Sequence, residues 1–172
     1  MFEGIVVVKS LKNENRTFDY LWGIFLLLEI FSGEFFKNYN PFVLLQILGF
    51  FFLLLAISFI PIPLILFPRK RDEEKYEHFF DVPHVIKTGI YGLVRHPQYL
   101  GWIFVIIGLF FIRQEPVGAL FGIFGLFFLN YCVENEENNL IKKFGKEYEL
   151  YKATVPRWNL ILGFYRYFKK DS

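Results

Sequence analysis

Two short polar motifs lie directly against long apolar runs, and both contain side chains that can bind a ligand or move a proton. The first is RHPQY at residues 95–99, and the second is ENEE at residues 134–137. Pro97 suits the first turn of a helix, so His96 lies beside unpaired backbone N–H groups that favour an anion. The glutamates favour a cation. The two motifs therefore predict a site for a ligand that carries both charges.

The sequence between the motifs predicts that they meet. Only RQEP, at residues 113–116, separates the two apolar runs, so these runs form an antiparallel helical hairpin. The start of one helix then lies beside the end of the other. An amino-acid-like group suits such a site, and S-adenosylmethionine contains one. The residues that converge are Arg95, His96 and Tyr99 with Glu134, Glu136 and Glu137.

The same residues also have purely structural interpretations. An Arg or His at a membrane boundary can be a positive anchor, and Tyr91, Tyr99 and Trp102 can be interfacial aromatics. The glutamates can form a solvated face, and Cys132 can be a small apolar filler. None of these interpretations requires both polar clusters to lie at one end of one hairpin.

The composition is that of a membrane protein. The chain has 172 residues, of which 54% are hydrophobic and 24 are Phe, more than a water-soluble domain of this size can bury. One cysteine excludes an intrachain disulfide and a cysteine-rich metal site, and no bound metal is expected. We expect one domain over residues 1–172, with the first two spans in 1–68 and the hairpin, loop and tail in 69–172.

The expected fold class is all-α integral membrane, with about four transmembrane helices. The apolar segments cover approximately residues 20–36, 41–67, 97–112 and 116–133. Pro61 and Pro63 are expected to kink or end the second segment. Glu29 and Glu34 interrupt the first segment, and they are expensive there unless they face protein or water.

An amphipathic helix is expected after the fourth span, lying on the membrane or against the loop before the third span, where it would close a cofactor pocket. Its apolar positions recur at steps of three and four, and Pro156 should end it. The aromatic and basic tail, RWNLILGFYRYFKK, is expected at the membrane interface. The apolar positions are Leu140, Ile141, Phe144, Tyr148 and Tyr151.

The charges of the loops predict the orientation of these spans. A four-span arrangement places all but two of the 19 Lys and Arg side chains on one side, the exceptions being Lys37 and Arg113. The positive-inside rule then makes both termini and the polar site cytoplasmic. The cell membrane is the expected location.

The stretch TGIYGLVRHPQYLGW followed by EENNLIKKFGKEYELYKATVP resembles the isoprenylcysteine carboxyl methyltransferase family, which belongs with the membrane phospholipid methyltransferases. Its pattern is G-x-Y, then R-H-P-x-Y-x-G, a helical hairpin, E-E-x-x-L-x-x-x-F-G-x-x-Y-x-x-Y and V-P. Every position is filled between Gly89 and Pro156. The resemblance implies an integral membrane methyltransferase that uses S-adenosylmethionine.

The resemblance also assigns roles to individual residues. Arg95 would orient an anionic substrate group. An amine or thiol acceptor must also lose a proton, and by the chemistry of that step His96, Glu136 or solvent would take it. Arg95, His96 and Glu136 form the expected catalytic set. The expected cofactor contacts are Val85, Ile86, Tyr91, His96, Tyr99, Glu136 and Glu137.

One departure concerns the methyl acceptor. The carboxyl methyltransferases place an Arg about one turn before the Glu pair, whereas this chain has Cys132 there. Isoprenylcysteine carboxylates are therefore expected to be weak acceptors unless Arg95 or Arg157 replaces that contact. The acceptor class remains an amphiphilic small molecule or lipidated substrate: an isoprenylcysteine-like carboxylate, a lipid amine or a thiol. Membrane lipids are expected partners, nucleic acid is not, and the oligomeric state is left open.

Two alternatives belong to other functional classes. An NADPH-dependent membrane reductase of the sterol or steroid type shares a similar hairpin and an R-H-P-x-Y-x-G element. Those proteins commonly have Glu after that Gly, where this chain has Trp102, and they lack the full E-E-x-x-L-x-x-x-F-G run. A non-catalytic membrane protein is the other alternative.

Overall fold

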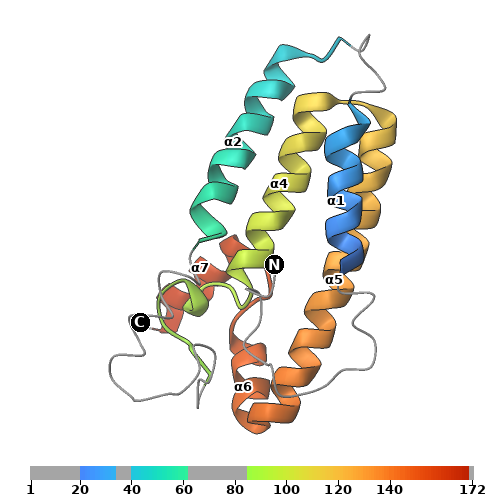
Figure 1. Ribbon diagram of the computed structural model, residues 1–172. Coiled ribbons are helices and arrows are strands. Elements are labelled where there is room, and N and C mark those ends of the chain that lie inside the picture. The colour runs from blue at the N-terminus through green and yellow to red at the C-terminus, as the bar shows by residue number, and fades with distance from the viewer. Residues whose placement is uncertain (1–19, 34–39, 62–84, 171–172) are drawn as a thin grey trace. The chain divides into compact units, whose positions relative to one another are not determined.

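The computed structural model describes residues 20–33, 40–61 and 85–170, and the described chain is helical, with short irregular connections. The all-α prediction is therefore confirmed over these residues. Figure 1 shows the helices in chain order. They are α1 (Leu21–Ser32), α2 (Val43–Phe59), the 3-10 turn η2 (Gly89–Gly92), α4 (Pro97–Arg113), α5 (Pro116–Phe144), α6 (Lys146–Thr154) and α7 (Leu160–Lys170).

The described residues fall into two compact units. The bundle unit contains α1, α2 and residues 98–133, which are most of α4 and the first part of α5. The site unit contains residues 85–97 and 134–170, which include η2, the end of α5, α6 and α7. Each unit is described by itself below. The single domain expected over residues 1–172 stays a prediction.

Four apolar helices occur where the sequence predicts four apolar segments. Among the described residues, α5 alone has both the length and the hydropathy to cross a membrane. Helices α1, α2 and α4 are apolar but shorter, with 12, 17 and 17 residues. Helix α2 ends at Phe59, two residues before Pro61, as expected; Pro63 lies outside the described residues.

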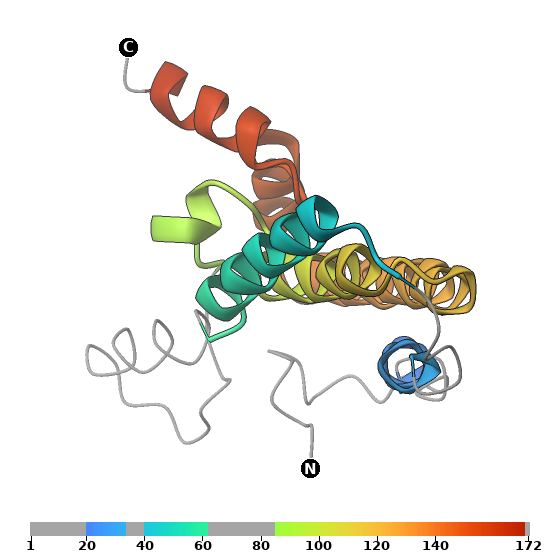
Figure 2. The same cartoon turned by 90° about the horizontal axis from the view of Figure 1, so that it is seen from above.

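Close helix packing and aromatic contacts hold the bundle unit together. A Cβ added to Gly49 on α2 would lie 2.7 Å from the backbone oxygen of Gly108 on α4, so the two backbones nearly touch. Trp22 of α1 packs on Trp102 of α4 with ring centroids 5.3 Å apart. Figure 2 shows α1 nearly end-on, beside the α4–α5 hairpin.

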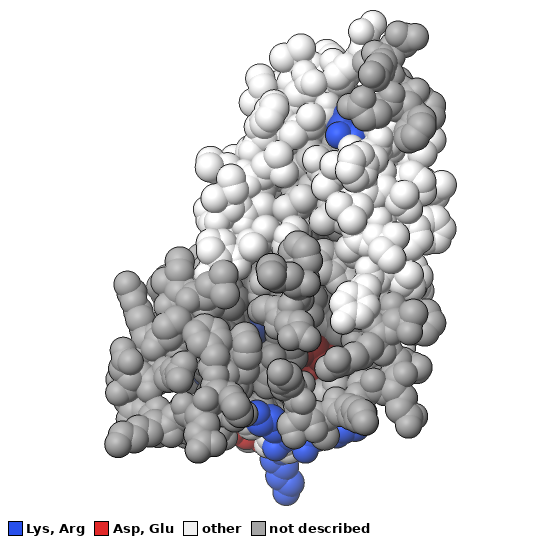
Figure 3. Space-filling model, in the orientation of Figure 1, with Lys and Arg blue, Asp and Glu red and all other residues white. Residues whose placement is uncertain are grey.

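The carboxylate of Glu29 is buried inside the bundle unit, with 1% of the residue exposed. Beside it, Ser32 Oγ donates to Glu115 Oε1 at 2.5 Å, and Arg113 Nη1 donates to the Glu29 carbonyl at 3.1 Å. Glu29 was expected to face protein or water, and it faces protein. Glu34 lies outside the described residues. Glu29, Arg113 and Glu115 carry the only charged side chains among the described residues of the bundle unit. The visible face of this unit is almost uniformly uncharged (Figure 3).

The end of α5 differs from the prediction. A single amphipathic helix was expected after the fourth apolar segment, but α5 continues without a break to Phe144 and α6 begins at Lys146. The prediction of a separate single helix after the fourth apolar segment is therefore wrong. The polar residues after Val133 all tolerate a helix, and the first residue that ends it is Gly145, whose φ of 55° suits glycine.

Candidate active site

The site unit joins two segments that are far apart in the sequence. The backbone N–H of Arg95 donates to the Pro156 carbonyl at 3.0 Å, and that of His96 donates to the Arg157 carbonyl at 3.4 Å. Helix α4 begins at the next residue, Pro97, which has no N–H to leave unpaired. The chain just before α4 is thereby held along the chain that follows α6.

Arg95 is buried, and its guanidinium is engaged on every nitrogen. Nε and Nη2 donate to Glu137 Oε1 at 3.0 and 2.7 Å. Nη1 donates to the Lys152 carbonyl at 3.0 Å and to the Val155 carbonyl. Those carbonyls belong to the end of α6 and the residue after it, so Arg95 ties α6 to α5. Only 8% of the residue is exposed.

Glu137 is the centre of a cationic cluster. Besides Arg95, Arg157 Nη2 donates to its Oε2 at 2.6 Å, and Lys152 Nζ lies 3.3 Å from the same oxygen. His96 Nε2 lies 3.3 Å from Oε1. Burial by itself raises the pKa of Glu137, but the hydrogen bonds from His96, Arg157 and Arg95 outweigh burial and hold that pKa well below its ordinary value. Glu137 is therefore ionised at neutral pH.

His96 lies between two carboxylates. Its Nε2 faces Glu137, and its Nδ1 lies 3.9 Å from Glu136 Oε1. A neutral imidazole carries one N–H, so it can donate to only one of them at a time. Burial and then the charge of Glu136 raise the pKa of Tyr91, so the Tyr91 hydroxyl keeps its proton at neutral pH.

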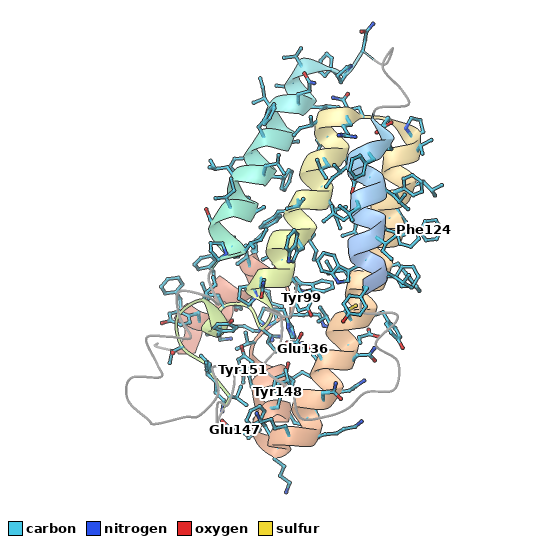
Figure 4. The ribbon with its side chains drawn as sticks, in the orientation of Figure 1. Tyr99, Phe124, Glu136, Glu147, Tyr148 and Tyr151 are labelled. Carbon is cyan, nitrogen blue, oxygen red and sulfur yellow. The ribbon has the colours of Figure 1, made fainter. Side chains whose placement is uncertain are left out.

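Aromatic residues of α6 form an apolar wall in the same unit. Tyr148 and Tyr151 pack on each other with ring centroids 5.8 Å apart, and burial raises the pKa of both hydroxyls. Tyr151 donates its hydroxyl to the Tyr91 carbonyl at 2.7 Å and so holds η2 against α6 (Figure 4). Val85 packs against this cluster, which also contains Leu140 and Val155.

The structure brings together four of the sequence-predicted site residues directly: Arg95, His96, Glu136 and Glu137. Glu134 also joins them, 3.6 Å from Arg157 Nη1. Tyr91, Val85 and Ile86 belong to the same unit, on the segment that leads into α4. Tyr99 belongs to the bundle unit, where it is buried in the first turn of α4 (Figure 4). The binding and catalytic roles of all these residues stay predictions.

Sequence reasoning missed two members of the cluster. It gave Lys152 no role, and it considered Arg157 only as a substitute contact for a carboxylate acceptor. The position of Arg157, directly after the V-P pair, is the only sequence signal for it. Its side chain is 24% exposed, in contrast to the buried guanidinium of Arg95.

The donors and acceptors of this unit fit an amino-acid moiety. The carboxylate of Glu136 can accept from an ammonium group, and the Tyr91 hydroxyl and the cations around Glu137 can donate to a carboxylate. Within the described part of the chain, no group of three or more His, Cys, Asp or Glu side chains is placed to hold a metal ion. The arrangement therefore suits binding and alignment of an organic zwitterion.

Comparison with known families gives a match over most of the chain. The family model for phospholipid methyltransferase matches residues 42–147. That range contains α2, the hairpin of α4 and α5, and both polar motifs.

Several curated proteins resemble a little under half of the chain. Protein-S-isoprenylcysteine O-methyltransferase of Dictyostelium discoideum is 40% identical over 82 residues, 46% of this chain and 34% of that protein. The enzymes of that name from Mus musculus and Saccharomyces cerevisiae are 35% and 38% identical over 44% and 41% of this chain, and 27% and 30% of their own length. The chain thus aligns with only 27% to 34% of the length of these relatives. No solved structure matches it.

Proposed function

The chain belongs to the phospholipid methyltransferase family, and from that premise we propose that it is an integral membrane enzyme that transfers a methyl group from S-adenosylmethionine to a lipophilic or amphiphilic acceptor. In this proposal four apolar helices cross the membrane, and both termini and the site are cytoplasmic. The observation that carries the proposal is the contact of Arg95 and His96 with Glu136 and Glu137, which lie 40 to 42 positions further along the sequence.

Within the proposed cofactor site, we assign the two glutamates different tasks. Glu137 already binds Arg95, Arg157 and Lys152, so a further cation would compete with three that are in place. Glu136 therefore holds the cofactor's ammonium group, with His96 beside it. Tyr91 donates its hydroxyl to the cofactor. Val85, Ile86, Tyr99 and Glu137 complete the proposed set.

The protein's contribution to the reaction is alignment. S-adenosylmethionine, when bound, supplies a methyl group that its sulfonium already activates, so the enzyme need not activate it further. A carboxylate acceptor needs no base, whereas an amine or thiol must lose a proton, for which His96 and Glu136 are the candidates. Arg95 acts as a positioning residue, because each of its guanidinium nitrogens donates to a protein acceptor.

The acceptor is proposed from the cations that remain accessible. The helix position one turn before Glu136 holds Cys132, so α5 offers no cation there for a substrate carboxylate. Arg157 is the partly exposed guanidinium of the site cluster, and its planar fork suits a carboxylate. Methyl transfer to N-acetyl farnesylcysteine tests this: transfer that Arg157→Lys slows at least tenfold supports a carboxylate acceptor held by Arg157. No transfer by the wild type directs the assignment to lipid amines and thiols.

Cofactor binding tests the proposal itself. Isothermal titration of the protein in detergent with S-adenosylhomocysteine should give a binding isotherm, and NADPH should give none. His96→Ala and Glu136→Ala should each weaken the affinity by about 10- to 100-fold, since each leaves a buried polar group unpaired. Lys142→Ala, an exposed change on the same helix, is the matched control. NADPH binding, or unchanged affinity in both variants, would reject the proposed function.

A further inference from the structure

One face of helix α7 packs against the rest of the site unit. A Cβ added to Gly163 would lie 2.1 Å from the Leu93 carbonyl oxygen, so this helix and the chain after η2 are in direct backbone contact. Tyr167 covers Gly92, where an added Cβ would lie 3.2 Å from its ring. Arg166 Nη1 donates to the carbonyls of Ala153 and Thr154 at 3.3 and 3.2 Å. Positions 163, 166 and 167 share one side of the helix.

The opposite side of α7 is an apolar stripe exposed to solvent. Its members recur at steps of three and four, the spacing of a single helix face. The exposed fractions are 85% for Ile161, 47% for Phe164, 62% for Tyr165 and 64% for Phe168. Lys169 lies next to this stripe, with Nζ 5.8 Å from the centre of the Tyr165 ring. Figure 2 shows α7, in red, running outward to the C-terminal end of the described chain.

We propose that α7 is an interfacial helix that docks on the anionic surface of a lipid bilayer. A helix with an aromatic and aliphatic face bordered by cations lies in the plane of the interface, with that face at the acyl boundary and the cations among the headgroups. Each Lys or Arg near an anionic surface adds about 1 kcal/mol of attraction. Lys169, which lies beside the stripe, supplies such a charge. The bilayer is the one in which the proposed function places this enzyme.

Docking on lipid also stabilises the chain that leads into the site. The contact face of α7 holds Gly92 and Leu93, which directly follow Tyr91. It also holds the end of α6, next to the Val155 carbonyl that accepts from Arg95. A lipid-bound α7 therefore restrains η2 and the end of α6 together. The effect of this restraint on cofactor affinity rests on the proposed function.

Hydrogen exchange of the full chain in nanodiscs tests the proposal. Discs of phosphatidylcholine alone are compared with discs that contain added phosphatidylglycerol. The anionic lipid should slow amide exchange about tenfold both in α7 and in residues 89–94. Lys169→Glu and Ile161→Ser should each abolish this response to lipid. Lys142→Glu, which reverses an exposed charge on α5 instead, should leave the response intact.

Three results would overturn the inference. If α7 exchanged at the same rate in both kinds of disc, the docking surface would be rejected. It would also be rejected if Lys142→Glu lost the response to lipid as completely as Lys169→Glu does. A response confined to α7 would reject the link to η2. The affinity for S-adenosylhomocysteine in the same discs separates the two proposals: if exchange responds to lipid as expected but the cofactor binds in neither disc, docking stands and the methyltransferase proposal fails.

Discussion

Arg95 illustrates how one side chain can tie several segments of the chain together. Its guanidinium accommodates one carboxylate oxygen and two backbone carbonyls, which come from α5, the end of α6 and the residue after α6. Only the planar fork of Arg can reach all of them at once. Arg157 binds the same glutamate but is partly exposed, so water can replace its contacts.

Arg95→Lys should therefore destabilise the site unit more than Arg157→Lys does. We expect a loss of about 2–4 kcal/mol for Arg95→Lys, because carbonyls and a carboxylate lose buried donors, and below about 1 kcal/mol for Arg157→Lys. Hydrogen exchange of α6 in detergent measures both. Equal effects of the two changes would show that Arg95 has no special structural role.

The buried carboxylate of Glu137 predicts a pH dependence. A carboxyl group whose folded pKa is depressed stabilises the fold fully above its unfolded pKa, near the ordinary value of 4.5. That stabilisation is lost as the pH falls below this value toward the folded pKa. Between pH 5 and 8, Glu137 should therefore contribute a constant amount.

Exchange rates in α6 measured from about pH 7 down to pH 3, after correction for intrinsic exchange, should show stability decreasing only in the acidic range. Glu137→Gln should be less stable at neutral pH and should lose much of this acid dependence. A wild-type stability that rises on acidification would contradict the assigned role of Glu137.

The convergence of Arg95 and His96 with the glutamates was predictable, because a connection this short forces the two helices into a hairpin. The different contacts of Glu136 and Glu137 could not be predicted in this way. They depend on the direction of each side chain at the end of α5 and on where the chain runs after Pro156, and neither follows from periodicity. Arg157 was missed as a partner of Glu137 for the same reason.

At the scale of elements, sequence patterns located the apolar helices well and the connections less well. The start of α4 at Pro97 and the end of α2 before Pro61 follow from proline chemistry. The uninterrupted α5 was not predicted, because the change from apolar to polar residues at Glu134 was taken for a boundary. A change from apolar to polar residues alters the surroundings of a helix but does not end the helix. Helix α5 ends only at Gly145, where the backbone adopts a positive φ.

The close approach of α2 and α4 gives a prediction for the bundle unit. Gly49→Leu should destabilise it by roughly 2–3 kcal/mol or more, because the new side chain would meet the backbone of Gly108 and Ile112. Gly23→Leu, with no atom within 4 Å of its added Cβ, is the control and should be neutral or stabilising. Midpoints of denaturation in mixed detergents measure both.

If Gly49→Leu left the midpoint unchanged, the contact between α2 and α4 would be contradicted. A loss of stability in Gly23→Leu of the same size would show that leucine is unfavourable at either glycine for a reason unrelated to helix packing.

At the scale of the whole molecule, the composition and the charge distribution carry the proposed topology. We propose a four-span protein with both termini in the cytoplasm, because the chain has four apolar helices and this arrangement would place all but two of its 19 Lys and Arg on one side. Reporter fusions after Ser172 and within residues 113–116 should report opposite sides of the membrane, with the C-terminal fusion cytoplasmic. An extracytoplasmic C-terminus would contradict this topology.

The central claim is that the motifs at residues 95–96 and 136–137 form one cofactor site. A structure of the purified protein with S-adenosylhomocysteine tests it most directly. We predict that the ligand's ammonium group lies within hydrogen-bond distance of the Glu136 carboxylate, with Tyr91 and His96 contacting the same amino-acid moiety, while Arg95 keeps its bonds to Glu137. A ligand bound away from Glu136 and His96, or no bound ligand at saturating concentration, would contradict the claim.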